Sequence, residues 1–370
     1  MSDGQGRIQA LDRLRGLLVA LMALDHANYF VAQAHTSGEY WGGPFPDYPT
    51  AAAFLIRLVT HPAAPGFFFL LGAGAALSAA RRTGEGWQEG RTRRRLLLRG
   101  ALLIAAQLLV VNRAWELTPG GWGVGLYVGV LTALGAALLV AAWLLEVKTV
   151  LLLIAATVLL VATDLLTPPV SRWADPFPPI LRLLFVPGGT RALWVNYPLL
   201  PWLGLTLLGL AFGRWLKRDP AGAQRWILWI GLGALGSFAG LRLANGFGNI
   251  RTRGGGWIGF FNVVKYPPSL TFVLLTMGFN LVVLRLLFLV RESRGHRWDP
   301  LVVYGSTPLF FYITHLFLYA GIGRLFTPRG TSHAPMLLCW LLGGALLYPL
   351  CAGYRRLKER QDSSSALRLF

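Results

Sequence analysis

The sequence predicts an all-α protein, a polytopic membrane bundle of about ten transmembrane helices. Hydrophobic residues make up 54% of the 370 residues, charged residues make up 14%, and the mean hydropathy is +0.51. A soluble domain carries about 25% charged residues. Apolar runs long enough to cross a bilayer, about 18 residues or more, recur along the chain. These features exclude a soluble enzyme, a disordered chain and a disulfide-based scaffold.

The predicted spans are separated by short polar connections or by segments rich in glycine and proline. Asp25 and His26 separate the first apolar stretch from the cleavage-like sequence Ala32-Gln33-Ala34. We therefore expect the first span to be retained rather than removed as a signal peptide. The second span is long enough for extra turns or a tilt. In chain order the spans are 11–33, 51–80, 96–113, 123–144, 149–166, 196–215, 226–244, 269–290, 301–323 and 335–354.

The distribution of basic residues predicts the topology. The chain has 35 Lys+Arg against 16 Asp+Glu, a net charge of +19. When the connections are assigned alternately to two sides, most basic residues fall on the side of both termini, which predicts an N-in, C-in arrangement. This bias explains the net positive charge, so binding of nucleic acid is not needed to account for it. We find no repeat and no long linker, and expect one domain over 1–370, with a core at 7–355 and a basic cytoplasmic tail at 356–370.

Two polar residues of the first span share one helix face. Arg15 and His26 are 11 residues apart, which is three helical turns plus about 20°, or about 16 Å along the axis. An ionisable side chain costs about 2.5–3.5 kcal/mol inside a bilayer, so it needs a partner or a wet cavity. This geometry suits a long anionic donor such as a coenzyme A thioester, with arginine on phosphate and neutral histidine as a base. The alternative is a snorkelling Arg15 and a packing His26.

The second span carries Arg57 and His61, and His61 is followed by Pro62-Ala63-Ala64-Pro65. The prolines free backbone groups, which is tolerated only beside protein or water. His61 is therefore either a site residue or a group that stabilises a kink. Further along, Gly72, Gly74 and Ala76 favour close helix contact.

Polar residues also mark the later spans. Lys265 and Tyr266 end an exoplasmic connection just before a proline pair, where Lys265 either binds phosphate or sugar or anchors the interface. His315 lies within the ninth span among aromatic residues and needs a partner there. The chain contains no P-loop, no nucleophile elbow, no HExxH and no CxxC, so we expect no metal site.

Several blocks of sequence resemble membrane proteins of bacteria related to heparan-alpha-glucosaminide N-acetyltransferase, within the wider transmembrane acyltransferase superfamily. The blocks run in order through most of the chain. They are Leu11-Asp12-Arg13-Leu14-Arg15-Gly16 with Met22-Ala23-Leu24-Asp25-His26, His61-Pro62-Ala63-Ala64-Pro65, Tyr197-Pro198-Leu199-Leu200-Pro201-Trp202, Lys265-Tyr266-Pro267-Pro268-Ser269-Leu270, and Pro308-Leu309-Phe310-Phe311-Tyr312 with His315.

The resemblance implies ten or eleven helices in a bacterial inner membrane. It also implies an acyl-CoA donor, acetyl-CoA above all, supplied from the cytoplasm, and a saccharide or glycolipid acceptor met on the far side. It implies a catalytic histidine, carried to His26, and an arginine that helps hold the donor, carried to Arg15. In the lysosomal enzyme of this family the proposed catalytic histidine lies beyond the first helix, so His26, His61 and His35 all stay open as the base.

Our leading hypothesis is an acyltransferase in which His26, positioned by Asp25 or His61, deprotonates the acceptor. Direct transfer and an acyl-histidine intermediate both stay open. We assign donor binding to Arg15, Asp12 and Lys265. We assign acceptor binding to Tyr266, His315 and Arg57. The rival hypotheses are a transporter or lipid-intermediate flippase that uses the same residues, and a non-catalytic scaffold. Membrane lipids are expected partners, and a homo-oligomer is left open.

Overall fold

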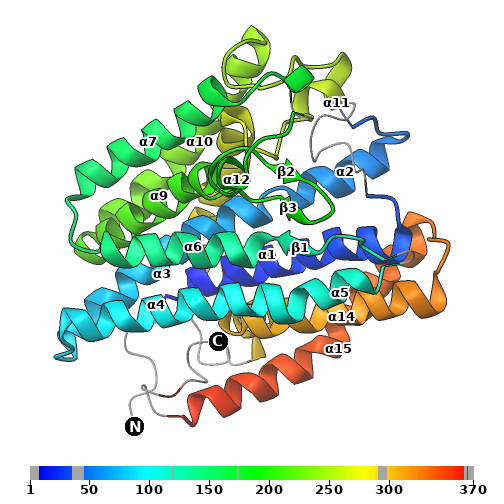
Figure 1. The fold of residues 1–370 in the computed structure, drawn as a ribbon. Coiled ribbons are helices and arrows are strands. Elements are labelled where there is room, and N and C mark those ends of the chain that lie inside the picture. The colour runs from blue at the N-terminus through cyan, green and yellow to red at the C-terminus, as the bar shows by residue number, and fades with distance from the viewer. Residues whose placement is uncertain are drawn as a thin grey trace.

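The computed structural model describes residues 8–35, 46–118, 121–172, 175–290, 298–361 and 365. Across these residues the fold is a bundle of α-helices with one small sheet (Figure 1), as the sequence predicts. The axes of most long helices lie roughly parallel to one another (Figure 1). Most of the predicted loop at 34–50 and parts of the predicted tail lie outside the described residues.

The helices follow the predicted spans closely, with proline or a polar residue at several of their starts. Their bounds are α1 Gln9–Ala27, α2 Ala51–Thr60, α3 Ala63–Gly84, α4 Glu89–Ala106, α5 Asn112–Glu116, α6 Val130–Trp143, α7 Thr149–Leu166, α8 Pro179–Leu184, α9 Leu199–Arg218, α10 Pro220–Ala244, α11 Gly256–Phe261, α12 Leu270–Leu289, α13 Pro300–Ser306, α14 Pro308–Phe326 and α15 His333–Glu359. Wider π-helical turns at Asn28–Ala32 and Gln107–Val111 extend α1 and join α4 to α5.

Eight helical segments within the described residues are long and apolar enough to span a membrane, and they correspond to eight of the predicted spans. The other two are α1, which carries charged residues at both ends, and α6, which has only 14 residues. The chain is therefore an integral membrane protein with a helix at every predicted span. The ninth span is divided into two helices, α13 and α14, because Pro308 has no N–H to donate the hydrogen bond that would continue a single helix.

The prediction of a helix over 123–129 is wrong. Residues Leu126–Val128 form strand β1, which pairs in parallel with β3 (Leu193–Val195), and β3 pairs antiparallel with β2 (Gly188–Gly189). Glycines recur at 123, 125 and 129, and glycine is a poor helix former. The small sheet places Tyr127 and Asn196 next to each other, and the Asn196 amide donates to the Tyr127 hydroxyl over 3.0 Å.

Helix α1 lies among the other helices and contacts α13 backbone to backbone. A Cβ atom added to Gly16 would collide with the Leu301 carbonyl, and one added to Gly305 would collide with the Asp12 carbonyl. Both positions must therefore stay glycine for the two helices to approach this closely. The contact fixes the first turns of α1, which carry Arg15.

The predicted close contact along α3 holds at Gly72 and not at Gly74. A Cβ atom at Gly72 would collide with the Thr206 carbonyl of α9, so the two backbones touch there. At Gly74 a Cβ atom would meet nothing within 4 Å, because this glycine faces an internal cavity. Two residues along a helix turn by about 200°, so the two glycines point in different directions.

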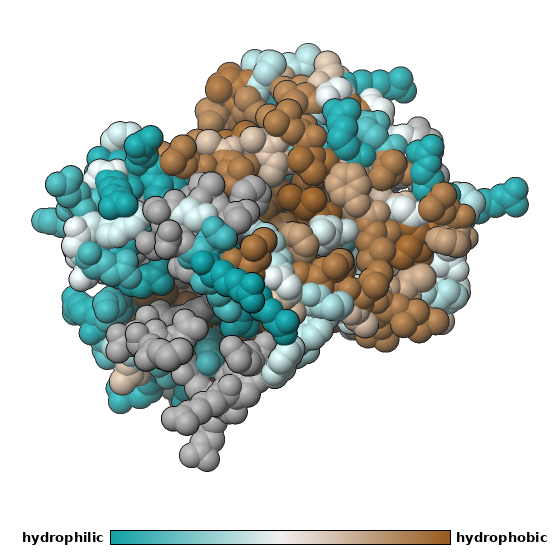
Figure 2. Space-filling model, turned by 90° about the horizontal axis from the view of Figure 1, so that it is seen from below, coloured by the Kyte–Doolittle hydropathy of each residue, from teal (hydrophilic) through white to brown (hydrophobic). Residues whose placement is uncertain are grey.

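Hydrophilic residues gather toward the end of the molecule where α3 turns into α4, and hydrophobic residues cover much of the remaining surface in that view (Figure 2). Large apolar side chains are exposed along α10 and α15, including Trp229, Ile230, Leu341 and Leu346. An apolar surface of this extent fits contact with lipid chains. The predicted tail starts as helix, since α15 continues to Glu359.

Candidate active site

A cavity of about 110 Å³ lies between α1, α3, α4, α6 and α14. We call it the apolar cavity, because most of its lining side chains are hydrophobic. Two guanidinium groups, those of Arg15 and Arg99, are the charged members of the lining. The full lining is Arg15, Met22, Phe67, Leu70, Leu71, Gly74, Arg99, Leu103, Val130, Leu131, Leu134, Pro308, Leu309 and Tyr312.

Arg15 is held in place by two oxygen atoms. Its Nη1 donates to Oδ1 of Asp12 over 2.8 Å and to the Gly305 carbonyl over 3.0 Å. Asp12 is 4% exposed, so it anchors Arg15 rather than facing the cavity. The Gly305 bond depends on the close α1–α13 contact described above. Asp12, predicted to bind the donor together with Arg15, contacts Arg15 in the structure and does not line the cavity.

Arg99 is a site residue that sequence reasoning missed, although it entered the topology as a helix-end charge. It makes no hydrogen bond or ion pair with the described residues, and its side chain lines the apolar cavity. Its electrostatic neighbours are Arg15, Arg82 and Arg95, which are all cationic. Two guanidinium groups in the cavity wall, with two more close to Arg99, give this end of the cavity the chemistry that attracts an anion.

A second cavity of about 40 Å³ adjoins the first, and we call it the polar cavity. Both cavities are lined by Val130 and Tyr312, so they meet at these two residues. Arg15 and His26, predicted to share a face of the first helix, line the two adjoining cavities. The lining of the polar cavity is Asp25, His26, Tyr29, His35, Trp115, Tyr127, Val130, Asn196, Tyr197, Tyr266 and Tyr312.

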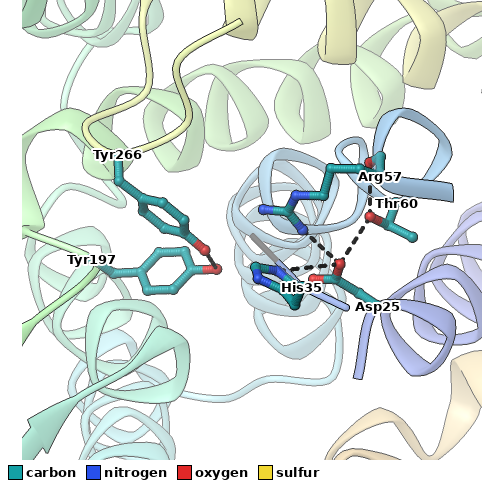
Figure 3. A network of polar contacts seen from close by, with 6 residues as sticks. All are labelled: Asp25, His35, Arg57, Thr60, Tyr197 and Tyr266. Atoms are coloured by element: carbon teal, nitrogen blue, oxygen red, sulfur yellow. Dashed lines mark hydrogen bonds and ion pairs between the residues drawn. The ribbon is translucent and has the colours of Figure 1, made fainter. Parts of the chain in front are cut away.

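Asp25 is the centre of a charged cluster in the wall of the polar cavity. Its Oδ1 accepts from Nη1 of Arg57 over 2.6 Å and from the Thr60 hydroxyl over 3.2 Å, and it lies 3.7 Å from Nε2 of His35. Figure 3 shows these side chains converging on the Asp25 carboxylate. Arg57 is 2% exposed and lines neither cavity. The structure therefore places Arg57 against Asp25, and its predicted contact with an acceptor stays a prediction.

Two tyrosines face this cluster from the other side of the polar cavity (Figure 3). The hydroxyls of Tyr197 and Tyr266 are 2.9 Å apart and hydrogen bonded. Tyr197 precedes α9 and Tyr266 precedes α12, so two segments distant in sequence build one wall. Nζ of Lys265 lies 5.1 Å from the Tyr266 ring centre, and its charge acts on Asp25 and His26. Lys265, predicted to hold the donor with Arg15, thus lies near the polar cavity instead.

His26 is paired with His315. Nδ1 of His26 lies 2.7 Å from Nε2 of His315, and the edge of Trp115 packs on the His26 ring at 5.7 Å. The positioning role predicted for Asp25 or His61 stays a prediction, and the hydrogen-bond partner found for His26 is His315. The Asp25 side chain points in a different direction from that of His26, because successive residues on a helix project about 100° apart.

His61 is buried at 1% exposure with its ring edge-on to Phe272, and it lines neither cavity. The structure therefore brings together His26, His35 and His315, and it leaves His61 behind the site. The residues that sequence reasoning missed are mostly aromatic: Tyr29, Trp115, Tyr127, Tyr197 and Tyr312. No pattern in the sequence indicates that these five rings line one cavity.

The fold and the site define a membrane protein with two neighbouring cavities, one apolar with guanidinium groups and one polar with imidazoles. Comparison with known families identifies the class of protein. Residues 7–237 match the family described as heparan-alpha-glucosaminide N-acetyltransferase, catalytic, and the chain belongs to this family. No curated protein matches the chain.

The family match identifies a membrane acyltransferase and covers part of the site. Arg15, Asp25, His26 and Arg57 lie within the matched residues. Lys265, Tyr266 and His315 lie beyond them, so their place in the site rests on the three-dimensional structure alone.

Proposed function

We propose that this protein moves an acetyl group from cytoplasmic acetyl-CoA to a hydroxyl or amine of a sugar-like acceptor on the opposite side of a bacterial inner membrane. The observation that carries the proposal is the pair of adjoining cavities along α1, with guanidinium groups in one and imidazoles in the other. Family membership supports acyl transfer.

The apolar cavity has the chemistry to take the donor. Arginine binds phosphate through two parallel N–H donors, and Arg15 and Arg99 supply such groups. The hydrophobic lining between them and Tyr312 suits the aliphatic arm of the thioester. A donor that enters from the basic end of the molecule then places its acyl group toward the junction with the polar cavity.

The polar cavity has the chemistry to take the acceptor and its proton. Nε2 of His26 makes no hydrogen bond to the described residues, and the ring lines the cavity. His26 Nε2 accepts the proton of the acceptor hydroxyl or amine while that oxygen or nitrogen bonds to the thioester carbonyl carbon. The C–S bond then breaks, and His26 returns the proton to the thiolate, giving acetylated acceptor and free CoA. Tyr312, at the junction, is the hydroxyl proposed to stabilise the carbonyl oxygen.

His35 is the second candidate for the base, because it lines the same cavity and lies beside the Asp25 carboxylate. A carboxylate that orients an imidazole is a recurring arrangement for proton transfer. If His26 is the base, the electrostatic field around the acceptor is instead set by Asp25, Arg57 and His35. The tyrosine and tryptophan rings provide apolar faces and hydroxyl groups, which suit a saccharide.

Purified wild type and three variants, His26→Gln, His35→Gln and His61→Gln, separate these roles. The assay follows acetyl-CoA hydrolysis and acetyl transfer to a panel of hexoses and amino sugars. We expect His26→Gln to lower kcat by about 10²–10⁴-fold, the usual contribution of a general base, and His61→Gln to change it little. His333→Gln, outside both cavities, is the matched control. A His26→Gln protein that keeps full turnover while His35→Gln loses it transfers the role to His35.

A further inference from the structure

His26, which lines the polar cavity, and His315, which is buried next to it, form an oriented pair. We propose that His315 is a positioning residue that fixes the tautomer of His26, leaving its Nε2 unprotonated and facing the cavity. This inference rests on the proposed function, in which His26 is the base. It assigns His315 a role different from the acceptor binding that its sequence position suggests.

The geometry of the pair is that of an in-plane hydrogen bond. The ring planes are 17° apart, and the ring centres are 5.0 Å apart. The nitrogen atoms are 2.7 Å apart, so the rings meet edge to edge in nearly one plane rather than face to face. An N–H in one ring therefore points along the lone pair of the other, which is the geometry of a good hydrogen bond.

A backbone carbonyl decides which ring donates. Nδ1 of His315 lies 2.8 Å from the carbonyl oxygen of Phe311. A carbonyl oxygen accepts and never donates, so Nδ1 of His315 carries the hydrogen. In a neutral His315 the other nitrogen, Nε2, then holds a lone pair and accepts from Nδ1–H of His26. A neutral His26 with hydrogen on Nδ1 has its own lone pair on Nε2.

The surroundings of His315 favour the neutral ring. The side chain is 0% exposed, and its ring packs against Phe311, Tyr312 and Tyr319. Its described contacts include no carboxylate. A charged ring would therefore bury an unpaired charge, which costs several kcal/mol. Because Phe311 and His315 belong to consecutive turns of α14, the carbonyl that orients His315 is itself fixed by the helix.

The pair also assists the proton transfer. When Nε2 of His26 takes the acceptor proton, the ring becomes an imidazolium whose Nδ1–H still donates to His315. This bond is then charge-assisted and stronger than in the resting state. No second proton moves, and the proton on Nε2 leaves with the thiolate. His315 thus orients the base before the reaction and stabilises its charged form during it.

Nitrogen-15 NMR of histidine-labelled protein in lipid nanodiscs tests the tautomer directly, without turnover. We expect the His26 ring, assigned by its loss in His26→Gln, to show a protonated Nδ1 and an unprotonated Nε2. In His315→Met, which has similar bulk and no nitrogen, we expect a mixture of the two tautomers. His61→Gln is the matched control, since it removes another buried imidazole and leaves the His26 signals unchanged. A wild-type His26 protonated at Nε2 overturns the proposal.

Kinetics test the role of the pair in catalysis. We expect His315→Met to lower kcat by about 10²-fold with KM for acetyl-CoA within about twofold, because binding at the apolar cavity is intact. His315→Gln keeps an acceptor oxygen for His26 and is expected to recover kcat to within about fivefold of wild type. A folded His315→Met protein with wild-type kcat overturns the proposal. Absence of acetyl transfer in the wild type contradicts the proposed function instead, and the NMR result still decides the tautomer.

Discussion

At the scale of single residues, the charged groups of α1 are paired with groups of opposite charge. Asp25 is paired with Arg57, Arg15 with Asp12, and Arg13 with Asp299, whose Oδ2 accepts from Nε over 2.9 Å. Each pair places a cation against a carboxylate inside an otherwise apolar bundle, where a single charge is costly. Pairing lets α1 carry ionisable residues through the membrane.

The Arg57–Asp25 pair gives a prediction about stability. Arg57→Gln leaves the Asp25 carboxylate without its closest cation, and breaking a buried pair in this way costs about 3–5 kcal/mol. We expect a lower thermal midpoint in detergent for Arg57→Gln and for Asp25→Asn. The double variant is expected to lose less than the sum of the two single losses, because no unpaired charge is left. Purely additive losses would show that the two side chains do not stabilise each other.

At the scale of secondary-structure elements, glycine positions separate packing from cavity. Gly72 of α3 lies against the α9 backbone, whereas Gly74, two residues further, opens onto the apolar cavity. The same helix thus supports the bundle on one side and leaves room for a ligand on another. We therefore expect a side chain at residue 74 to affect ligand binding rather than folding.

This difference predicts the effect of Gly74→Leu. The added side chain meets no atom near its Cβ and extends into the apolar cavity, so we expect normal expression and thermal stability. It fills the space proposed for the donor, and we expect KM for acetyl-CoA to rise at least about tenfold. Gly236→Leu on α10 is the control, since that glycine also has nothing near its Cβ. Equal KM values for the two variants would exclude the apolar cavity as the donor site.

The elements were predictable from sequence, and the site was predictable only in part. Apolar length is a local property, so α7 and α12 have nearly the predicted bounds. Helical periodicity correctly placed Arg15 and His26 on one face. The partners were not predictable, because Asp25 meets Arg57 and His26 meets His315 only after distant helices pack. Tyr197 and Tyr312 belong to blocks that carry the family resemblance, but the sequence does not indicate that the two side chains line one cavity.

At the scale of the whole molecule, polarity separates the two ends. Hydrophilic residues gather at the end where α3 meets α4, and the polar cavity is built from the opposite helix ends and loops (Figures 1 and 2). Positive charge on one side orients a membrane protein with that side in the cytoplasm. The guanidinium groups proposed to bind the donor would then face the cytoplasm, the compartment proposed to supply acetyl-CoA.

Cysteine labelling tests this orientation. The native Cys339 and Cys351 are replaced by Ser and Ala, and single cysteines are introduced as Gly90→Cys at the start of α4 and Gly255→Cys before α11. Both glycines are exposed and have nothing near their Cβ. We expect a membrane-impermeant maleimide to label Gly255→Cys in intact cells and Gly90→Cys only after permeabilisation. The reverse pattern would invert the proposed topology and place the donor outside the cell.

The shared wall of the two cavities has a consequence for the energetics of the cell. Val130 and Tyr312 stand where the spaces meet, one a hydrocarbon side chain and the other a bulky ring. A continuous chain of water molecules through the bundle would let protons and ions leak across and dissipate the electrochemical gradient that the membrane maintains. If the proposed function holds, side chains packed at Val130 and Tyr312 would let an acetyl group pass from donor to acceptor without opening a continuous path for protons and salt.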